Sequence, residues 1–170
     1  MFEQDFTDAI AMLKADHRKV EQLFASFEEA KGASRKEALA KEICTELKVH
    51  TMLEEEIFYP ALKGKIEQDM LDEAYVEHDG AKVLINDIEA AEPDEDYYDA
   101  KVKVLSEEIE HHVKEEEQPS EGMFAQARKT DVDLVDLRDR MLARKQELMA
   151  QAETGDLPPA KVTAVDLNPA

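Results

Sequence analysis

Two histidine–glutamate pairs with a spacing of four residues are the feature of this sequence best suited to chemistry. They are His50 with Glu54 and His112 with Glu116. Residues four apart on an α-helix share one face and lie about 6 Å apart along the axis, so each pair can address one cation or bridge two neighbouring ones. Imidazole nitrogens and carboxylate oxygens are common ligands of iron, manganese and zinc. The spacing therefore indicates metal binding.

Four histidines take positions at which a buried helix face would carry apolar residues. His17 continues a series of apolar residues spaced three or four apart, and His78 continues another; the two series are Ile10, Leu13, Val20 and Phe24, and Leu71, Ala74, Ala81 and Ile85. The two pairs continue similar series, which begin with Ile43 and Leu47 and with Leu105 and Ile109. Each of four helices is thus predicted to turn one histidine inward, and two of them add a glutamate.

A single histidine on an apolar face is more often a hydrogen-bonded core residue than a ligand. However, chance would place four of five histidines on four such stripes only on the order of once in a thousand, if about a quarter of helical positions face inward. Two buried carboxylates would also cost several kcal/mol unless a cation paired with them. The donors are too many for one tetrahedral zinc and suit two ions, each with two histidines, bridged by Glu54 and Glu116. Iron is favoured, and manganese or zinc is a weaker alternative.

Apolar periodicity and helix start and stop signals predict an all-α protein. The expected helices are one capped by Thr7 and ending at Gly32; one with a Ser34–Glu37 capping box, a face of Leu39, Ile43, Leu47, Ile57 and Ala61, and a stop at Gly64; one from Leu71 to a break at Pro93; one capped by Asp94 that ends near Pro119; and a shorter one from Thr130 or Asp131 to Gln151. This order predicts an antiparallel up-down-up-down four-helix bundle with an additional C-terminal helix. We expect residues 1–152 to form this domain and residues 153–170 a flexible tail.

The composition narrows the class of protein. The 170 residues fit one domain, and 41 acidic against 21 basic side chains give a net charge of −20, which argues against binding nucleic acid or anionic membranes. No apolar run approaches the roughly 18 residues that span a bilayer, and the N-terminus lacks the pattern of a secretory signal. Cys44 is the single cysteine, so no internal disulfide is possible and a cytoplasmic location is expected. Cys44 itself is expected to be a buried, unreactive thiol.

Four pieces of the sequence, in this order and spacing, resemble the hemerythrin-like HHE cation-binding domains. They are residues 13–17, 50–60, 77–78 and 111–116, within a resemblance that covers about residues 7–150. The resemblance implies an antiparallel four-helix bundle that holds a non-haem, carboxylate-bridged pair of iron ions. It also implies the ligands, which are His17, His50, Glu54, His78, His112 and Glu116.

The sequence departs from the oxygen-carrying hemerythrins near His78. Those proteins carry a further histidine one helical turn away, where this sequence has Ala74 and Lys82. The missing imidazole predicts more open iron coordination and argues against pure reversible oxygen carriage. Tyr75 could approach the centre as a ligand or hydrogen-bond donor, although a core tyrosine is the more common case. His111 lies about 100° around the helix from its neighbour, so a surface or supporting role is expected.

We therefore expect a cytoplasmic di-iron protein that reacts with or senses oxygen, nitric oxide or peroxide. The sequence does not decide between a carrier, a sensor and an enzyme with redox activity toward peroxide or nitric oxide. The alternative is a metal-dependent sensory or interaction module, in which iron loading orders the bundle for a protein partner that the sequence does not identify. The loop at residues 119–122 follows Glu116 closely and is expected to influence ligand access.

Overall fold

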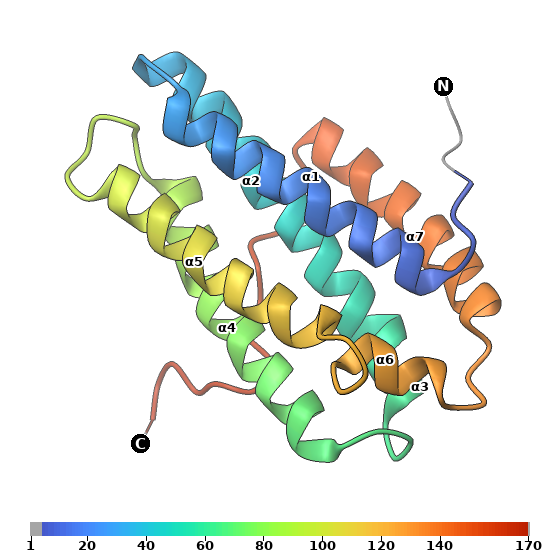
Figure 1. Ribbon diagram of the computed structural model, residues 1–170. Helices are drawn as coiled ribbons and strands as arrows, with labels where there is room; N and C mark the ends of the chain where they lie inside the picture. Colours follow the sequence, from blue (N-terminus) through green and yellow to red (C-terminus); the bar gives the residue numbers. More distant parts are fainter. Residues whose placement is uncertain (1–4, 170) are drawn as a thin grey trace.

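The computed structural model describes residues 5–169, in which every regular element is a helix (Figure 1). Four long helices pack as a closed ring in which α1 and α4 each contact both α2 and α5. These helices are α1 (Ala9–Glu29), α2 (Ala33–Leu53), α4 (Gln68–Ala90) and α5 (Tyr98–Glu117). A π-helical turn, η1 (Glu54–Phe58), continues α2 into α3 (Tyr59–Leu62), and α6 (Met123–Arg128) and α7 (Leu134–Thr154) complete the chain. The predicted all-α, antiparallel four-helix bundle with an additional C-terminal helix is confirmed.

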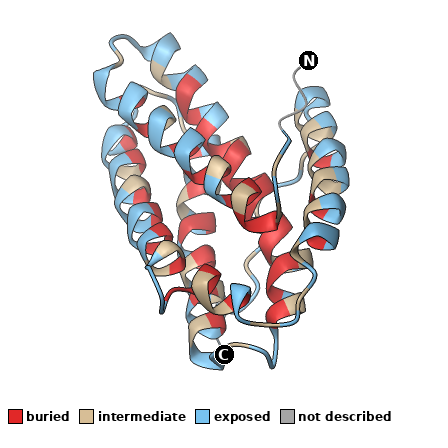
Figure 2. Cartoon of the chain, turned by 45° about the vertical axis from the view of Figure 1, so that its right-hand side comes forward, coloured by how far each residue is buried: buried red, intermediate tan, exposed pale blue. Residues whose placement is uncertain are grey.

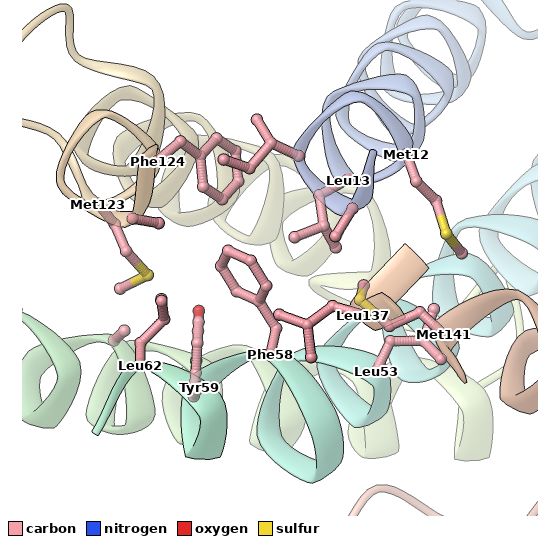
Figure 3. Close-up of a cluster of buried hydrophobic side chains, with 14 of the residues drawn as sticks. Met12, Leu13, Leu53, Phe58, Tyr59, Leu62, Met123, Phe124, Leu137 and Met141 are labelled. Carbon is pink, nitrogen blue, oxygen red and sulfur yellow. The ribbon is translucent and has the colours of Figure 1, made fainter. Parts of the chain in front are cut away.

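The helices turn their buried faces toward a common interior, as Figure 2 shows. Two hydrophobic clusters fill this interior. One lies where α1 meets α2 and α4 meets α5, and includes Val20, Phe24, Ile43, Leu47, Ile85 and Leu105. The other joins the opposite end of the bundle to α6 and α7, and includes Leu13, Leu53, Phe58, Phe124 and Met141 (Figure 3). A buried polar layer lies between them along the helices.

Several predicted helix boundaries are wrong because other residues cap the helices. Asp8 rather than Thr7 caps α1, since its carboxylate accepts a hydrogen bond from the backbone N–H of Ala11 at 2.9 Å. Gly32, at φ 87°, precedes α2 directly, so the Ser34–Glu37 capping box does not form and both residues lie inside the helix.

The later helix starts also differ. α5 begins at Tyr98 rather than after Asp94, because Tyr97 takes a left-handed conformation at φ 70° as the N-terminal cap. α7 begins after Asp133, whose side chain accepts hydrogen bonds from Val135 and Asp136, and not at Thr130 or Asp131.

The short helix α6 was not predicted. It follows a tight turn in which Gly122 lies so close to the end of α5 that a Cβ atom would meet backbone atoms of Gln118 and Glu115 at 2.6–2.8 Å. Met123 and Phe124 then enter the core. The Phe124 ring stacks on His17, with ring centroids 5.8 Å apart and planes 12° apart. The loop after Glu116 therefore positions a core helix against the polar layer.

The segment after α7 has no regular secondary structure among its described residues, which end at 169. It is nevertheless hydrogen bonded to α4 through Asn86 and Asp79, and the expected flexibility of residues 153–170 stays a prediction. α7 itself continues to Thr154, beyond the expected boundary at residue 152. No helix among residues 5–169 is long and apolar enough to cross a membrane.

Candidate metal centre

All six residues predicted to face inward meet in the polar layer. Each long helix contributes one histidine: His17 from α1, His50 from α2, His78 from α4 and His112 from α5. Glu54 begins the π-helical turn and Glu116 lies near the end of α5. None of the six residues is more than 6% exposed. The structure thus brings the predicted residues together, and their role as ligands stays a prediction.

The four histidines form two facing pairs. The Nε2 atoms of His17 and His50 are 3.2 Å apart, and those of His78 and His112 are also 3.2 Å apart. Two nitrogens that each lie about 2.1 Å from one shared ion, at an angle between a right angle and the tetrahedral angle, are about 3.0–3.4 Å apart. Each pair therefore has the spacing that one shared ion requires.

Both glutamates span the two histidine pairs. Glu54 places Oε1 3.2 Å from Nε2 of His50 and Oε2 3.0 Å from Nε2 of His78. Glu116 places Oε2 3.3 Å from Nε2 of His17 and Oε1 3.2 Å from Nε2 of His112. Each carboxylate thus has one oxygen at each pair, which is the arrangement of two bridging ligands.

Orphaned polar atoms test whether this cluster fits cations. Oε1 of Glu54 and Oε2 of Glu116 are buried and accept no hydrogen bond from any described residue. An unsatisfied buried carboxylate oxygen is costly, and a cation between the imidazoles and the carboxylates would satisfy both oxygens. The donor atoms of His17, His50, Glu54 and Glu116 lie within 4.8 Å of one another, and so do those of Glu54, His78 and His112. The residues therefore fit two cations.

The electrostatics of the cluster point the same way. Burial disfavours a charged His50, yet the carboxylates of Glu54 and Asp16 outweigh it and raise the pKa of His50 to about 10. Burial and Glu116 disfavour a charged Glu54, but His50 outweighs them and lowers the pKa of Glu54 to about 2. Despite the same effect of burial, the mutual attraction of His112 and Glu116 raises the pKa of the first and lowers that of the second. The carboxylates thus attract positive charge, which protons or metal cations can supply.

Each of the four histidines also has a carboxylate beside its outer nitrogen, Nδ1, supplied by another helical segment. These contacts are Asp16 to His50 (3.2 Å), Glu55 to His78 (3.5 Å), Glu77 to His112 (3.0 Å) and Glu117 to His17 (2.8 Å). A carboxylate of α1 thereby supports the histidine of α2, and a carboxylate of η1, which continues α2, supports the histidine of α4. A carboxylate of α4 supports the histidine of α5, and a carboxylate of α5 supports that of α1, so the four contacts form a closed ring around the bundle. A carboxylate at Nδ1 fixes the orientation of an imidazole and leaves Nε2 to face a metal.

Sequence reasoning missed these four outer carboxylates. Each is the immediate chain neighbour of a predicted inward residue, within the pairs Asp16–His17, Glu54–Glu55, Glu77–His78 and Glu116–Glu117. The available signal was an acidic residue beside each inward position. A one-residue step leaves the apolar stripe, so the stripe of a single helix does not indicate that such a residue contacts the centre.

Tyr59 is a further residue of the centre that was not predicted. Its buried hydroxyl donates to Oε1 of Glu116 at 2.7 Å and to Oε2 of Glu54 at 3.1 Å, and lies 3.2 Å from Nε2 of His78. Burial and the two carboxylates raise the pKa of Tyr59 well above its usual value, so the phenol keeps its proton. Tyr59 is thus a seventh residue with a polar atom beside the six predicted residues.

The π-helical turn places Tyr59 there. Pro60 has no backbone N–H and its ring crowds the carbonyl group four residues earlier, so a regular helix cannot continue through residues 56–60. The wider turn shifts the inward face by one residue. Phe58, Tyr59 and Leu62 are fully buried, whereas the predicted Ile57 and Ala61 are only half-buried. Figure 3 shows Phe58 and Tyr59 both extending from this segment into the interior.

Comparison with known proteins accounts for this arrangement. The hemerythrin HHE cation binding domain, described by a family profile, matches residues 8–124. The chain belongs to this family. The crystal structure of a hemerythrin HHE cation binding domain-containing protein from Mycobacterium kansasii has the same fold, with a TM-score of 0.71 over 88% of this chain and 94% of that one, at 22% sequence identity.

One curated relative is similar to part of this chain. The protein named DNA nickase from a Nostoc species is 26% identical over 106 residues, which are 62% of this chain and 30% of the relative. The chain thus spans less than a third of the curated relative that it matches. The buried histidine and glutamate clusters fit the cation binding for which the family is named.

Three other residues considered from the sequence lie outside the HHE centre. Tyr75 is half-buried and packs edge-on against Tyr59, with ring centroids 5.3 Å apart, so it supports that ring. His111 is 66% exposed and lies 3.2 Å from Glu115 on the surface. Cys44 is fully buried, and burial raises the pKa of its thiol to about 12, as expected for an unreactive cysteine.

A small cavity adjoins the histidines on the side of the α1–α2 turn. Its volume is about 20 Å³, and its walls combine the four histidines with apolar side chains that include Val20, Leu47, Ile109 and Val113. A space of roughly 10–15 Å³ is enough for one water molecule. The cavity therefore has room for one molecule of two or three atoms beside the imidazoles.

Proposed function

We propose that this HHE domain holds two iron ions and reacts with or senses a small ligand such as oxygen, nitric oxide or peroxide. The observation that carries the proposal is the pair of facing histidines on each side of Glu54 and Glu116, with both carboxylates reaching both sides. Two imidazoles and two carboxylate oxygens for each ion leave coordination positions open, which favours iron over a closed zinc site.

The bound iron would supply electrons and open coordination positions, and the residues of the chain would supply the rest. The outer carboxylates hold the imidazoles in orientation. The hydroxyl of Tyr59 can donate a hydrogen bond to a group that enters the space between Glu54 and Glu116. The volume of the cavity, about 20 Å³, limits the size of a molecule that can lie beside the histidines. These features support selection by size of an uncharged or weakly charged diatomic ligand or peroxide.

Anaerobic reconstitution with ferrous iron tests the proposal. We expect about two irons per chain for the full-length protein, and a charge-transfer absorption after exposure to oxygen, nitric oxide or peroxide. Glu54→Ala should lower the iron content because it removes an oxygen from both histidine pairs. Glu110→Ala is the matched control, since the Glu110 side chain is 62% exposed and pairs with Lys114 on the surface of α5. A full-length protein without bound iron, or a Glu54→Ala variant with unchanged iron content, would reject the proposal.

A sensory or interaction role is the second candidate, and one observation favours it. The four central histidines come from the four long helices, one from each, so cations bound there would link the whole bundle and stabilise it. A partner that binds only one metal state would support this role. The lone buried cysteine is consistent with a cytoplasmic location for either function.

A further inference from the structure

The chain returns to the bundle after α7 and docks along α4. Residues 156–165 form this segment, which we call the strap (Figure 1). At one point the side chain of Asn86 exchanges two hydrogen bonds with the backbone of Ala160, at 2.7 and 2.8 Å. At the other, the carboxylate of Asp79 accepts hydrogen bonds from three successive backbone N–H groups, those of Thr163, Ala164 and Val165, at 2.8, 2.6 and 2.7 Å. The strap is therefore fixed at two places on α4.

Lys82 connects the strap to the inside of the bundle. Its ammonium group donates to Oδ1 of Asp79 and to the hydroxyl oxygen of Thr163, both at 3.2 Å. It also lies 2.6 Å from Oε2 of Glu55. Lys82 is only 3% exposed, and these three acceptors replace the water contacts that its ammonium group lacks. Of these acceptors, Thr163 belongs to the strap, and Asp79 accepts hydrogen bonds from the backbone of the strap.

Glu55 contacts both Lys82 and His78, and so links the strap to the metal centre. It is the outer carboxylate of His78, with Oε2 3.5 Å from Nδ1, and this contact is longer than the 2.8–3.2 Å contacts at the other three histidines. Nδ1 of His78 is buried and has no hydrogen-bond partner among residues 5–169, and Oε1 of Glu55 is in the same condition. His78 is thus the least firmly supported of the four histidines, and Lys82 determines where its carboxylate lies.

We propose that the strap, acting through Asp79, Lys82 and Glu55, positions His78 for cation binding. These three are positioning residues, and the inference rests on the proposed function because it concerns the same centre. Docking of the strap should therefore affect the ion that His78 and His112 would hold. The contacts of Asp79, Lys82 and Glu55 lead to His78 and not to His17 or His50. Loss of an outer partner of a metal-bound histidine typically weakens metal binding about 10–100-fold.

Two full-length proline variants separate strap docking from general effects of proline. Ala164→Pro removes the central N–H group that binds Asp79, and Leu167→Pro places the same change three residues later, beyond the three amides. Anaerobic titration with ferrous iron against a competing chelator should show two ions in the parent protein. In Ala164→Pro we expect one ion to bind about 10–100-fold more weakly and the other to be unchanged. Leu167→Pro should match the parent, and far-ultraviolet circular dichroism would confirm that both variants keep their helices.

A milder pair of variants applies if Ala164→Pro folds poorly. Thr163→Val removes the hydroxyl that accepts from Lys82, whereas Thr163→Ser keeps it. Thr163→Val should weaken the same ion, and Thr163→Ser should restore parental binding. If Ala164→Pro and Thr163→Val both bind two ions as tightly as the parent protein does, the strap has no role in cation binding, and the proposed function still stands. A parent protein that binds no iron would overturn the proposed function, and the strap inference with it.

Hydrogen exchange of the strap provides a readout that does not involve activity. Coupling between two sites is reciprocal. If docking of the strap raises the affinity for one iron ion by a given factor, iron binding should slow hydrogen exchange of the Thr163, Ala164 and Val165 amides by the same factor. Lys82→Met should abolish this slowing, since it breaks the connection to Glu55. Strap amides that exchange equally fast with and without iron in the parent protein would contradict the inference.

Discussion

Glu77 precedes His78 in the chain, yet its Oε1 lies 3.0 Å from Nδ1 of His112 on the neighbouring helix. Its other oxygen lies 3.5 Å from the surface residue His111. Glu77 thus lies between the buried centre and the molecular surface, in contact with a residue of each. The same relation recurs around the bundle, where an acidic neighbour of one inward residue supports the histidine of another helix.

Replacement of Glu77 tests whether an outer carboxylate tunes the centre. Glu77→Gln keeps the size and an acceptor oxygen but removes the charge beside His112. We expect iron affinity to fall about 10–100-fold with unchanged helical content. Glu73→Gln is the control, because Glu73 lies one turn earlier on α4 and is exposed. Equal iron affinities in the two variants would show that the contact with His112 has no such role.

Tyr59→Phe tests the unpredicted donor. The change removes the only hydroxyl that donates to both Glu54 and Glu116 among the contacts of residues 5–169. Because both carboxylates are buried, the metal-free protein should lose about 1–3 kcal/mol of stability in urea denaturation. Tyr75→Phe should change stability by less than about 0.5 kcal/mol, since it retains the edge-on ring contact with Tyr59. Equal losses in the two variants would contradict the role given to the Tyr59 hydroxyl.

The inward residues could be predicted because a single helix determines them. His17 follows Leu13 by four residues and precedes Val20 by three, so the stripe of α1 alone fixes the direction of its side chain. The fold followed from similar stripes on four segments. The outer carboxylates could not be predicted in this way, because the rotation and offset between two helices decide whether Asp16 contacts His17 or His50.

The positions of Tyr59 and of the strap could not be predicted from the sequence, for different physical reasons. The stripe that reaches Glu54 predicts Ile57 as the next buried residue, and the π-helical turn before Pro60 buries Phe58 and Tyr59 in its place. The strap lacks a helical or strand pattern, and it is held through its backbone N–H groups. Backbone donors carry no signal in the residue types, so only the side chains that hold the strap, those of Asp79, Lys82 and Asn86, could mark it in the sequence.

Gly122 controls the turn between α5 and α6, and two glycine replacements should have opposite effects. A Cβ atom at Gly122 would meet the Gln118 nitrogen and the Glu115 and Gln118 carbonyl oxygens at 2.6–2.8 Å, so Gly122→Ala should cost about 1–3 kcal/mol. At Gly80, in the helix α4, the nearest atom is an oxygen of Glu108 at 3.9 Å, and Gly80→Ala should stabilise by up to about 1 kcal/mol. Thermal denaturation would measure both. A stable Gly122→Ala variant would show that α5 and α6 can separate.

The stability of the metal-free protein should depend on pH through the central cluster. The pKa of His50 rises from 6.5 to about 10 on folding, so its contribution is complete below pH 6.5 and is lost as the pH rises toward 10. The pKa of Glu54 falls from 4.5 to about 2, so its contribution is present above pH 4.5 and is lost as the pH falls toward 2. The unfolding free energy should therefore be largest between these ranges.

Urea denaturation at a series of pH values would measure this dependence. His50→Gln should flatten the alkaline decline because it removes a titrating group, whereas the exposed His111→Gln should leave the decline in place. Iron affinity should change in the opposite direction and increase with pH, because a metal binds the deprotonated imidazole. A metal-free protein that becomes more stable between pH 6.5 and 10 would contradict the charge arrangement of the cluster.

The cavity of about 20 Å³ should limit how fast a small ligand reaches the histidines. Val20→Ile adds one methylene group to its wall and should slow association of nitric oxide with the iron-loaded protein about tenfold, which corresponds to about 1.4 kcal/mol in the barrier. Val104→Ile makes the same change at a position on α5 that is 44% exposed and outside the cavity. Stopped-flow absorbance would compare the two variants at equal iron content. Equal rates would show that ligands reach the centre by another path, whereas a slower rate confined to Val20→Ile would identify this cavity as the binding space.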